Sequence, residues 1–258
     1  FLAGDGIHYE PRWFKPWPAG KHIQWKHDGK SYPLGDLLFE IGGLRVGFEI
    51  CEDAWVPGRP GPELAAQGVD IILNPSASHF AFAKHEVRKQ IVLDASRTFG
   101  ATYVYTNLIG NEAGRVIYDG EALIASAGKL LAEGPRFGFD DVYLTTAIID
   151  IDHVRMSHSR TTFTPAVDDS LRPVVRVEVR LPAADYVAAP PLPATVWADA
   201  KFEKHEEFSR AVALGLFDYL RKSRSRGFVV SLSGGADSAA IVYIIAAMVE
   251  LACQELGL

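Results

Sequence analysis

Short apolar runs alternate with polar, helically periodic segments over the first half of the chain. Residues 44–50 (LRVGFEI), 69–73 (VDIIL) and 101–108 (ATYVYTNL) are rich in branched or aromatic side chains and predict buried strands. Between them, residues 61–68 (GPELAAQG) and 85–100 predict helices. The apolar positions at helical spacing in the second helix are Val87, Ile91, Val92, Ala95 and Phe99. This β-α-β-α-β alternation predicts a layered α/β domain.

The pattern then becomes strand-like and later irregular. Residues 122–134 (ALIASAGKLLAEG) and 142–151 (VYLTTAIIDI) predict strands around a Gly-Lys turn, as an antiparallel continuation of the sheet. Residues 164–198 are rich in proline and weakly periodic, apart from one strand candidate at 174–180 (VVRVEVR). A linker or covering segment is therefore expected there.

A second periodic unit begins near residue 200. Residues 200–222 predict an amphipathic helix, because its apolar positions recur in steps of four: Phe208, Val212, Leu216 and Leu220. Residues 227–250 then read as an apolar strand, a glycine turn and a long apolar helix.

These patterns predict two domains, at residues 1–180 and 200–258, joined by a proline-rich linker at 181–199. The chain lacks an initiator methionine and ends inside an apolar helical pattern. We therefore expect a fragment in which the first domain lacks its N-terminal part and the second its C-terminal part.

Composition narrows the possible functions. Apolar residues make up 48% of the chain, enough for a substantial core. The net charge of −6, without long blocks of one sign, argues against a nucleic-acid partner, so any bound phosphate must be held locally. The two cysteines form no disulfide framework, and we expect no signal peptide and no apolar run long enough to cross a bilayer. These expectations predict a cytoplasmic protein without membrane contact.

The segment SLSGGADSA follows a predicted strand and opens a helix, where backbone amides and the helix dipole favour a phosphate. Gly234 and Gly235 are expected to take positive φ, and Ser233 and Ser238 to donate hydroxyl hydrogen bonds. Asp237 would repel a phosphate, so it is expected to bind a Mg²⁺ ion carried by a polyphosphate. An ordinary glycine bend with a capping residue is the simpler alternative. The complete string favours the phosphate site, whose residues are Ser231, Leu232, Ser233, Gly234, Gly235, Ala236, Asp237 and Ser238.

This Ser-Gly-Gly-x-Asp-Ser string resembles the signature of the N-type ATP pyrophosphatases, which adenylate a carbonyl or carboxyl oxygen and release pyrophosphate. It is not a Walker A loop, since GxxxxGK[ST] is absent. The resemblance implies a Rossmann-like α/β domain that uses ATP and Mg²⁺, and it leaves the substrate open.

Cys51 ends one of the predicted strands, in the stretch FEICEDAW. A cysteine in that place is more often small core filling than a nucleophile. However, the strand delivers it to a loop, WVPGRPGP, and α/β folds place chemistry at such strand ends. Glu52 and Asp53 follow directly, and negative charge beside a thiol disfavours the thiolate. A base and a cation must therefore come from other segments.

Three segments resemble nitrilase-superfamily amidases: VGFEICEDAWVPGRP, LNPSASHFAFAKHEVRKQ and HYEPRWF. The resemblance implies an α-β-β-α sandwich and a Glu-Lys-Cys triad. Cys51 would be the nucleophile and Glu10 the additional carboxylate that positions the catalytic groups. The family's oxyanion lysine and general-base glutamate would fall before Phe1.

The segment NPSASHFAFAKHEVR reads most simply as a serine-rich turn and the solvated start of a helix. Ser78 could equally hydrogen-bond an amino-acid ligand, and Lys84 or Arg88 could pair with its α-carboxylate. By resemblance to glutamine-using amidases, Ser78 and Lys84 are the expected glutamine contacts. No metal-ligand spacing is evident around the histidines, which include His79, His85, His153 and His158.

An amidase unit followed by this ATP-binding unit is similar to the glutamine-dependent NAD synthetases. The resemblance implies that Cys51 hydrolyses L-glutamine and that the released ammonia amidates deamido-NAD⁺ adenylated by ATP. It also implies a homo-oligomer. Two alternatives stay open: an amidohydrolase fused to a different ATP pyrophosphatase, and a non-catalytic assembly module in which Cys51 is merely packed.

Overall fold

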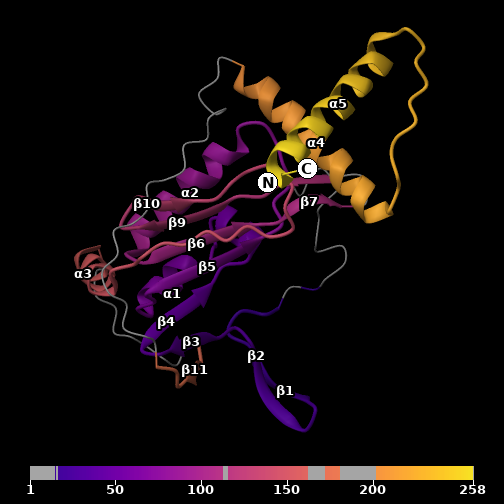
Figure 1. Ribbon diagram of the computed structural model, residues 1–258. Coiled ribbons are helices and arrows are strands. Elements are labelled where there is room, and N and C mark those ends of the chain that lie inside the picture. Colours follow the sequence, from indigo (N-terminus) through magenta and orange to yellow (C-terminus); the bar gives the residue numbers. More distant parts are fainter. Residues whose placement is uncertain (1–14, 16, 113–115, 162–171, 181–201, 258) are drawn as a thin grey trace.

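A mixed seven-stranded sheet forms the centre of the molecule in the computed structural model, which describes residues 15, 17–112, 116–161, 172–180 and 202–257 (Figure 1). The strand order is β10-β9-β6-β5-β4-β3-β11. The strands are β3 (Leu38–Ile41), β4 (Leu44–Phe48), β5 (Ile71–Ser76), β6 (Thr102–Asn107), β9 (Ala122–Ser126), β10 (Lys129–Glu133) and β11 (Val174–Val177). Strands β4, β5 and β6 are parallel. Their carboxyl ends, which carry the loops after β4 and β5, therefore lie at one edge of the sheet.

Two helices cover one face of this sheet, α1 (Gly61–Ala66) and α2 (Lys84–Phe99) (Figure 1). The predicted β-α-β-α-β run is thus confirmed as β4-α1-β5-α2-β6. Apolar side chains from both layers fill the space between them, among them Leu64, Ile72, Val92 and Tyr103. Val87 is an exception to the predicted apolar stripe, because its side chain is exposed.

The prediction of a strand at residues 142–151 is wrong. Strands β9 and β10 form the expected antiparallel pair, but residues 142–150 have no strand partner among the described residues, and helix α3 (Ile151–Thr161) begins where the strand should end. Exposed and half-buried positions still alternate through 142–150. The period-2 pattern therefore specifies an extended backbone, and pairing depends on a neighbouring strand. The candidate strand at 174–180 is confirmed in part, as β11, which pairs in parallel with β3.

Two small antiparallel ribbons accompany the large sheet. The hairpin of β1 (His22–His27) and β2 (Lys30–Gly35) projects from the body (Figure 1). The ribbon of β7 (Ile109–Glu112) and β8 (Val116–Asp119) lies beneath helix α4 (Glu203–Ser223), which packs on both of its strands.

Helix α4 forms as predicted, but its buried face differs from the predicted one. Phe208 is half exposed, and Val212, Leu216 and Leu220 are only partly buried. The buried positions include two acids, Glu207 and Asp218. Arg136 pairs with Glu207, while the Asn111 backbone N–H, Arg221 and Lys222 all reach Asp218. Paired charges therefore face the ribbon, which the apolar periodicity could not indicate.

Helix α5 (Ala236–Leu256) packs against α4 through an apolar cluster that includes Ala213, Phe139 and Met248. The strand expected before the glycine turn does not form, since residues 225–233 have no strand partner in the described part of the chain, and Val229 is fully exposed. The expectation that no apolar run could cross a bilayer is also wrong by length and composition, because the 21-residue helix α5 contains an 18-residue window with a mean hydropathy of 1.8. One such helix is weak evidence for a membrane span, because core helices of soluble proteins pass the same test.

The predicted linker at 181–199 lies outside the described residues, and the domain boundaries stay predictions.

Candidate active site

Cys51 occupies a strained turn at the carboxyl end of β4. It is the first residue of a 3₁₀-helix (Cys51–Trp55), with φ of +49° and a partly exposed side chain. A non-glycine residue in this left-handed region costs about 1–3 kcal/mol, and such residues cluster at active sites. The turn is fixed in part by Asp53, whose Oδ2 accepts the Ile50 backbone N–H at 2.9 Å. One of the two acids beside the thiol therefore binds the backbone.

The buried carboxylate of Glu49 supports the turn at Cys51. Glu49 is fully buried, and it accepts hydrogen bonds from Arg59 Nε at 2.9 Å, from Tyr103 Oη at 2.7 Å and from the Gly61 backbone N–H at 2.6 Å. Burial and the Glu49 carboxylate together raise the pKa of Tyr103, so the phenol stays protonated and donates. This network ties β4, β6 and the start of α1 together two residues before the thiol.

Lys84 opens α2 beside the cysteine turn. Its side chain is buried, its Nζ donates to the His79 carbonyl at 2.9 Å, and it lies 5.8 Å from the ring centre of Trp55. Burial, with help from the Arg88 charge, lowers the pKa of Lys84 to about 8, while attraction to Asp119 and Cys51 opposes the shift. The structure thus brings together two predicted site residues, Cys51 and Lys84.

Ser78 lies in the loop between β5 and α2 and is held through its backbone. Its N–H donates to Asn107 Oδ1 at 2.8 Å, and its carbonyl accepts from Asn107 Nδ2 at 2.9 Å and from Arg88 Nη2 at 3.1 Å. The residue is buried. Its position relative to Lys84 is therefore set by Asn107 and Arg88, since both Ser78 and His79 offer their carbonyls to Arg88.

Arg88 is structural and is not available for a ligand. Its guanidinium is fully buried and pairs with Asp119 through two bonds, of 2.8 and 2.9 Å, and with Glu121 at 3.2 Å. Asp119 also accepts from Arg136, which bonds Glu207 on α4. Burial opposes the charge on Arg88, but Asp119 and Glu121 outweigh it and raise its pKa. Sequence reasoning missed these partners, which lie more than thirty residues away along the chain.

Replacing Arg88 with methionine should lower the free energy of unfolding by about 3–5 kcal/mol, because the buried carboxylates of Asp119 and Glu121 would lose their guanidinium partner. Denaturant unfolding monitored by circular dichroism measures this change. Arg97→Met on the same helix is the control, since its pair with Asp94 is exposed and should contribute under about 1 kcal/mol. Equal losses in the two variants would contradict the assigned role of Arg88.

The predicted phosphate loop lies at the N-terminus of α5. Residues 231–237 are all exposed, and Gly234 has φ of +79°. The expectation for Gly235 is wrong, because its φ is −85° and it precedes the first helical residue in an extended conformation. Ser238 donates to the Gly235 carbonyl at 3.1 Å, which orders the turn. Asp237 lies in the first helical turn, so an exposed carboxylate and exposed backbone amides are adjacent, as a magnesium-bound phosphate requires.

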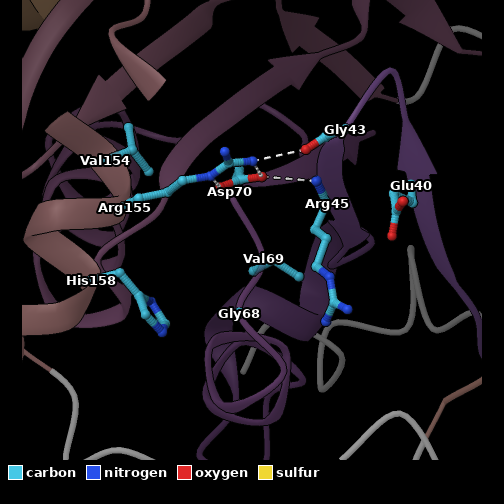
Figure 2. A pocket seen from close by; sticks show the side chains of 9 residues that line it. All are labelled: Glu40, Gly43, Arg45, Gly68, Val69, Asp70, Val154, Arg155 and His158. Carbon is cyan, nitrogen blue, oxygen red and sulfur yellow. Dashed lines mark hydrogen bonds and ion pairs between the residues drawn. The ribbon is translucent and has the colours of Figure 1, made fainter. Parts of the chain in front are cut away.

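The remaining predicted site residue, Glu10, lies outside the described residues. A separate cleft of about 420 Å³ lies at the opposite ends of the strands from Cys51 (Figure 2). It is lined by Glu40, Gly43, Arg45, Gly68, Val69, Asp70, Val154, Arg155 and His158. There Arg155 of α3 pairs with Asp70 at 2.9 Å and donates to the Gly43 carbonyl at 2.8 Å, which docks α3 on the sheet. Cys51 is not among the described residues that line this cleft.

Residues 4–160, more than half of the chain, match the carbon-nitrogen hydrolase family, and the chain belongs to that family. The nitrilase-like α/β fold class predicted from these segments is confirmed by this match, and the described residues form its mixed sheet with α1 and α2 on one face.

Individual relatives extend the similarity through the second unit. The chain is 34% identical over 98% of its length to mouse glutamine-dependent NAD(+) synthetase, and 31% identical over 97% to the Saccharomyces cerevisiae protein. A crystal structure of a glutamine-dependent NAD(+) synthetase from Cytophaga hutchinsonii covers 100% of the chain, with 39% identity and a TM-score of 0.70. The synthetase from Acinetobacter baumannii, solved with ADP, shares the fold at 20% identity and a TM-score of 0.57 over 93% of the chain. The chain spans 36% of the mouse protein, 37% of the yeast protein, 34% of the Cytophaga protein and 35% of the Acinetobacter protein.

Proposed function

We propose that this chain supplies the glutaminase centre and the start of the ATP site of a glutamine-dependent NAD(+) synthetase. The observation that carries the proposal is that one chain holds both a strained Cys51 beside a buried lysine and an exposed Ser-Gly-Gly loop at a helix start. Similarity to synthetases of that name over 98% of the chain supports it, because the similarity includes both sites.

In the first half-reaction, the Cys51 thiolate attacks the side-chain amide carbon of L-glutamine. The carbon–nitrogen bond breaks, the nitrogen takes a proton and leaves as ammonia, and a thioester remains on Cys51. Water then hydrolyses the thioester and releases glutamate. Lys84 pairs with the substrate α-carboxylate, Ser78 donates its hydroxyl to the substrate, and Glu10 positions the catalytic groups.

In the second half-reaction, the backbone amides and hydroxyls of residues 231–238 hold the polyphosphate of ATP. Asp237 supplies a carboxylate oxygen, the ligand type that Mg²⁺ prefers, next to that loop. The carboxylate of deamido-NAD⁺ is adenylated and pyrophosphate leaves; ammonia then displaces AMP to give NAD⁺. The ammonia travels from the first site inside a protein that works as a cytoplasmic homo-oligomer.

The proposal is tested by giving the complete gene product deamido-NAD⁺, Mg²⁺-ATP and either glutamine or ammonia. We expect NAD⁺, AMP and glutamate in equal amounts with glutamine. Glutamate released from glutamine, with no NAD⁺ formed from either nitrogen source, would favour an amidohydrolase fused to a different ATP pyrophosphatase. NAD⁺ formed from ammonia but not from glutamine would refute the proposed glutaminase centre.

The pH dependence of glutamine hydrolysis tests the role of Lys84. Because its pKa is about 8, the ammonium charge that attracts the α-carboxylate is present below pH 8 and is lost above it. We expect kcat/KM for glutamine to fall about tenfold per pH unit above this value. In Lys84→Arg the guanidinium stays charged, so this alkaline decline should disappear while Lys129→Arg, an exposed control, retains it. An unchanged decline in Lys84→Arg would refute the assignment.

A further inference from the structure

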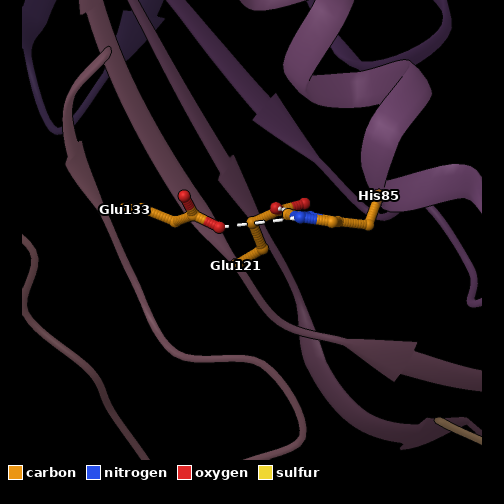
Figure 3. Close-up of side chains that lie close together, drawn as sticks. All are labelled: His85, Glu121 and Glu133. Atoms are coloured by element: carbon orange, nitrogen blue, oxygen red, sulfur yellow. Dashed lines mark hydrogen bonds and ion pairs between the residues drawn. The ribbon is translucent and has the colours of Figure 1, made fainter. Parts of the chain in front are cut away.

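The imidazole of His85 lies among three carboxylates at the start of α2. Its Nδ1 is hydrogen-bonded to Glu121, and its Nε2 lies 3.6 Å from Glu133 Oε1 and 3.4 Å from Glu86 Oε1. Figure 3 shows His85, Glu121 and Glu133 converging from α2, from the residue before β9 and from the end of β10. Ligand atoms of these three residues lie within 4.8 Å of one another. The histidine spacing in the sequence gave no sign of this cluster.

The second oxygen of the Glu121 and Glu133 carboxylates is already bound. Glu121 Oε2 accepts from Arg88 Nη1 at 3.2 Å, and Glu133 Oε2 accepts from Lys89 Nζ at 2.9 Å. Glu121 also has φ of +89°, a conformation that costs a non-glycine residue free energy and is held by its backbone bonds to Pro135 and Asn107. The Oε1 atoms of Glu121 and Glu133 are therefore fixed toward the imidazole.

We propose that this cluster binds a divalent transition-metal ion, of which zinc fits best. The ligands are His85 Nε2 and Glu133 Oε1, with Glu86 Oε1 as the third from the solvent side, where its side chain is 70% exposed and able to rotate. Ligands about 2.1 Å from a tetrahedral zinc lie about 3.4 Å apart, and the two separations measured from Nε2 are 3.4 and 3.6 Å. An imidazole nitrogen among the ligands favours zinc over magnesium or calcium.

Glu121 then acts as a positioning residue for the metal ligand. A metal-bound histidine normally gives its second ring N–H to a carboxylate, which fixes the tautomer and leaves the other nitrogen free to coordinate. The Nδ1 contact to Glu121 has this arrangement. Lys89 orients the second ligand, because it binds Glu133 Oε2 and leaves Glu133 Oε1 directed toward the imidazole.

The buried charged groups next to His85 include more carboxylates than guanidinium groups. Three buried carboxylates, those of Asp119, Glu121 and Glu207, face two guanidinium groups, those of Arg88 and Arg136. Lys89 and Glu133 compensate each other. A metal ion held by His85 Nε2, Glu133 Oε1 and Glu86 Oε1 would place positive charge beside these carboxylates.

Titration with Zn²⁺ without ATP, in a variant that carries both Cys51→Ala and Cys253→Ala so that neither thiol binds zinc, tests the site. We expect one zinc per chain by calorimetry and by elemental analysis after dialysis, and a rise in melting temperature. Co²⁺ should give the visible absorption of a tetrahedral site. Glu133→Gln and Glu86→Gln should each weaken zinc binding at least about tenfold, and Glu121→Gln about 10–100-fold.

His158→Asn on α3 is the control and should bind zinc normally. Glu86 is exposed, so Glu86→Gln is expected to fold like the parent chain and keeps the test decisive if a buried variant unfolds. A chain that binds no stoichiometric zinc overturns the proposal. Zinc binding that is unchanged by both Glu86→Gln and Glu133→Gln overturns it as well.

Discussion

Replacing Cys51 with alanine should abolish glutamine-dependent NAD⁺ synthesis while leaving synthesis from added ammonia within about twofold of the parent value. No thioester forms without the thiol, and loss of a catalytic nucleophile costs about 10⁴-fold or more in rate. The proposed ATP site should be unaffected, because residues 231–238 lie at the start of α5 and not in the cysteine turn. The measurement compares NAD⁺ formation by the complete gene product from each nitrogen source.

The second cysteine supplies the matched control. Cys253 lies on α5 as a free, partly buried thiol, and Cys253→Ala should keep both activities. Retained glutamine-dependent synthesis in Cys51→Ala would establish the packed-cysteine alternative. Loss of both activities in a folded Cys51→Ala protein would also count against the assignment, because the cysteine would then support the structure and not one half-reaction.

Replacing Asp237 with asparagine should have the complementary effect. Synthesis from both glutamine and ammonia should stop, while glutamine hydrolysis by the Cys51 site continues. Asparagine keeps the size of the side chain and its place in the first turn of α5, but it removes the negative charge that would hold Mg²⁺ on the ATP polyphosphate. Rates measured over a range of Mg²⁺ and ATP concentrations report this loss.

Glu250→Gln is the control for Asp237→Asn, because Glu250 is an exposed acid farther along the same helix. It should retain both half-reactions. If Asp237→Asn showed a largely unchanged dependence on Mg²⁺ and ATP, the magnesium assignment would be refuted, although the phosphate loop itself could still bind ATP through its amides.

The local parts of the site were predictable from the sequence. The branched apolar run before Cys51 predicted a strand, and the cysteine does lie at its carboxyl end, in the loop region of three parallel strands. Helix α2 and the loop before α5 also formed where the periodicity and the glycines indicated. Such features depend on residues within one or two turns of chain, so the sequence records them directly.

The pairing of distant charged groups was not predictable. Glu207 and Asp218 are buried on α4 because Arg136, Asn111 and the last turn of the helix satisfy them, yet an acid in an amphipathic pattern normally marks the solvent face. The network that runs from Arg88 through Asp119 and Arg136 to α4 also pairs groups that are far apart along the chain. Such pairing produces no periodic pattern in the sequence.

The sequence by itself determined the order of strands and helices around Cys51, the nucleophile candidate and the phosphate loop, because local propensity and hydrophobic period specify them. Only the tertiary structure decided that residues 142–150 stay unpaired among the described residues, that Lys84 is buried beside the cysteine turn and that His85 meets Glu121 and Glu133. The physical reason is that hydrogen-bond pairing, desolvation and charge compensation depend on which groups the fold brings together, and those groups are far apart along the chain.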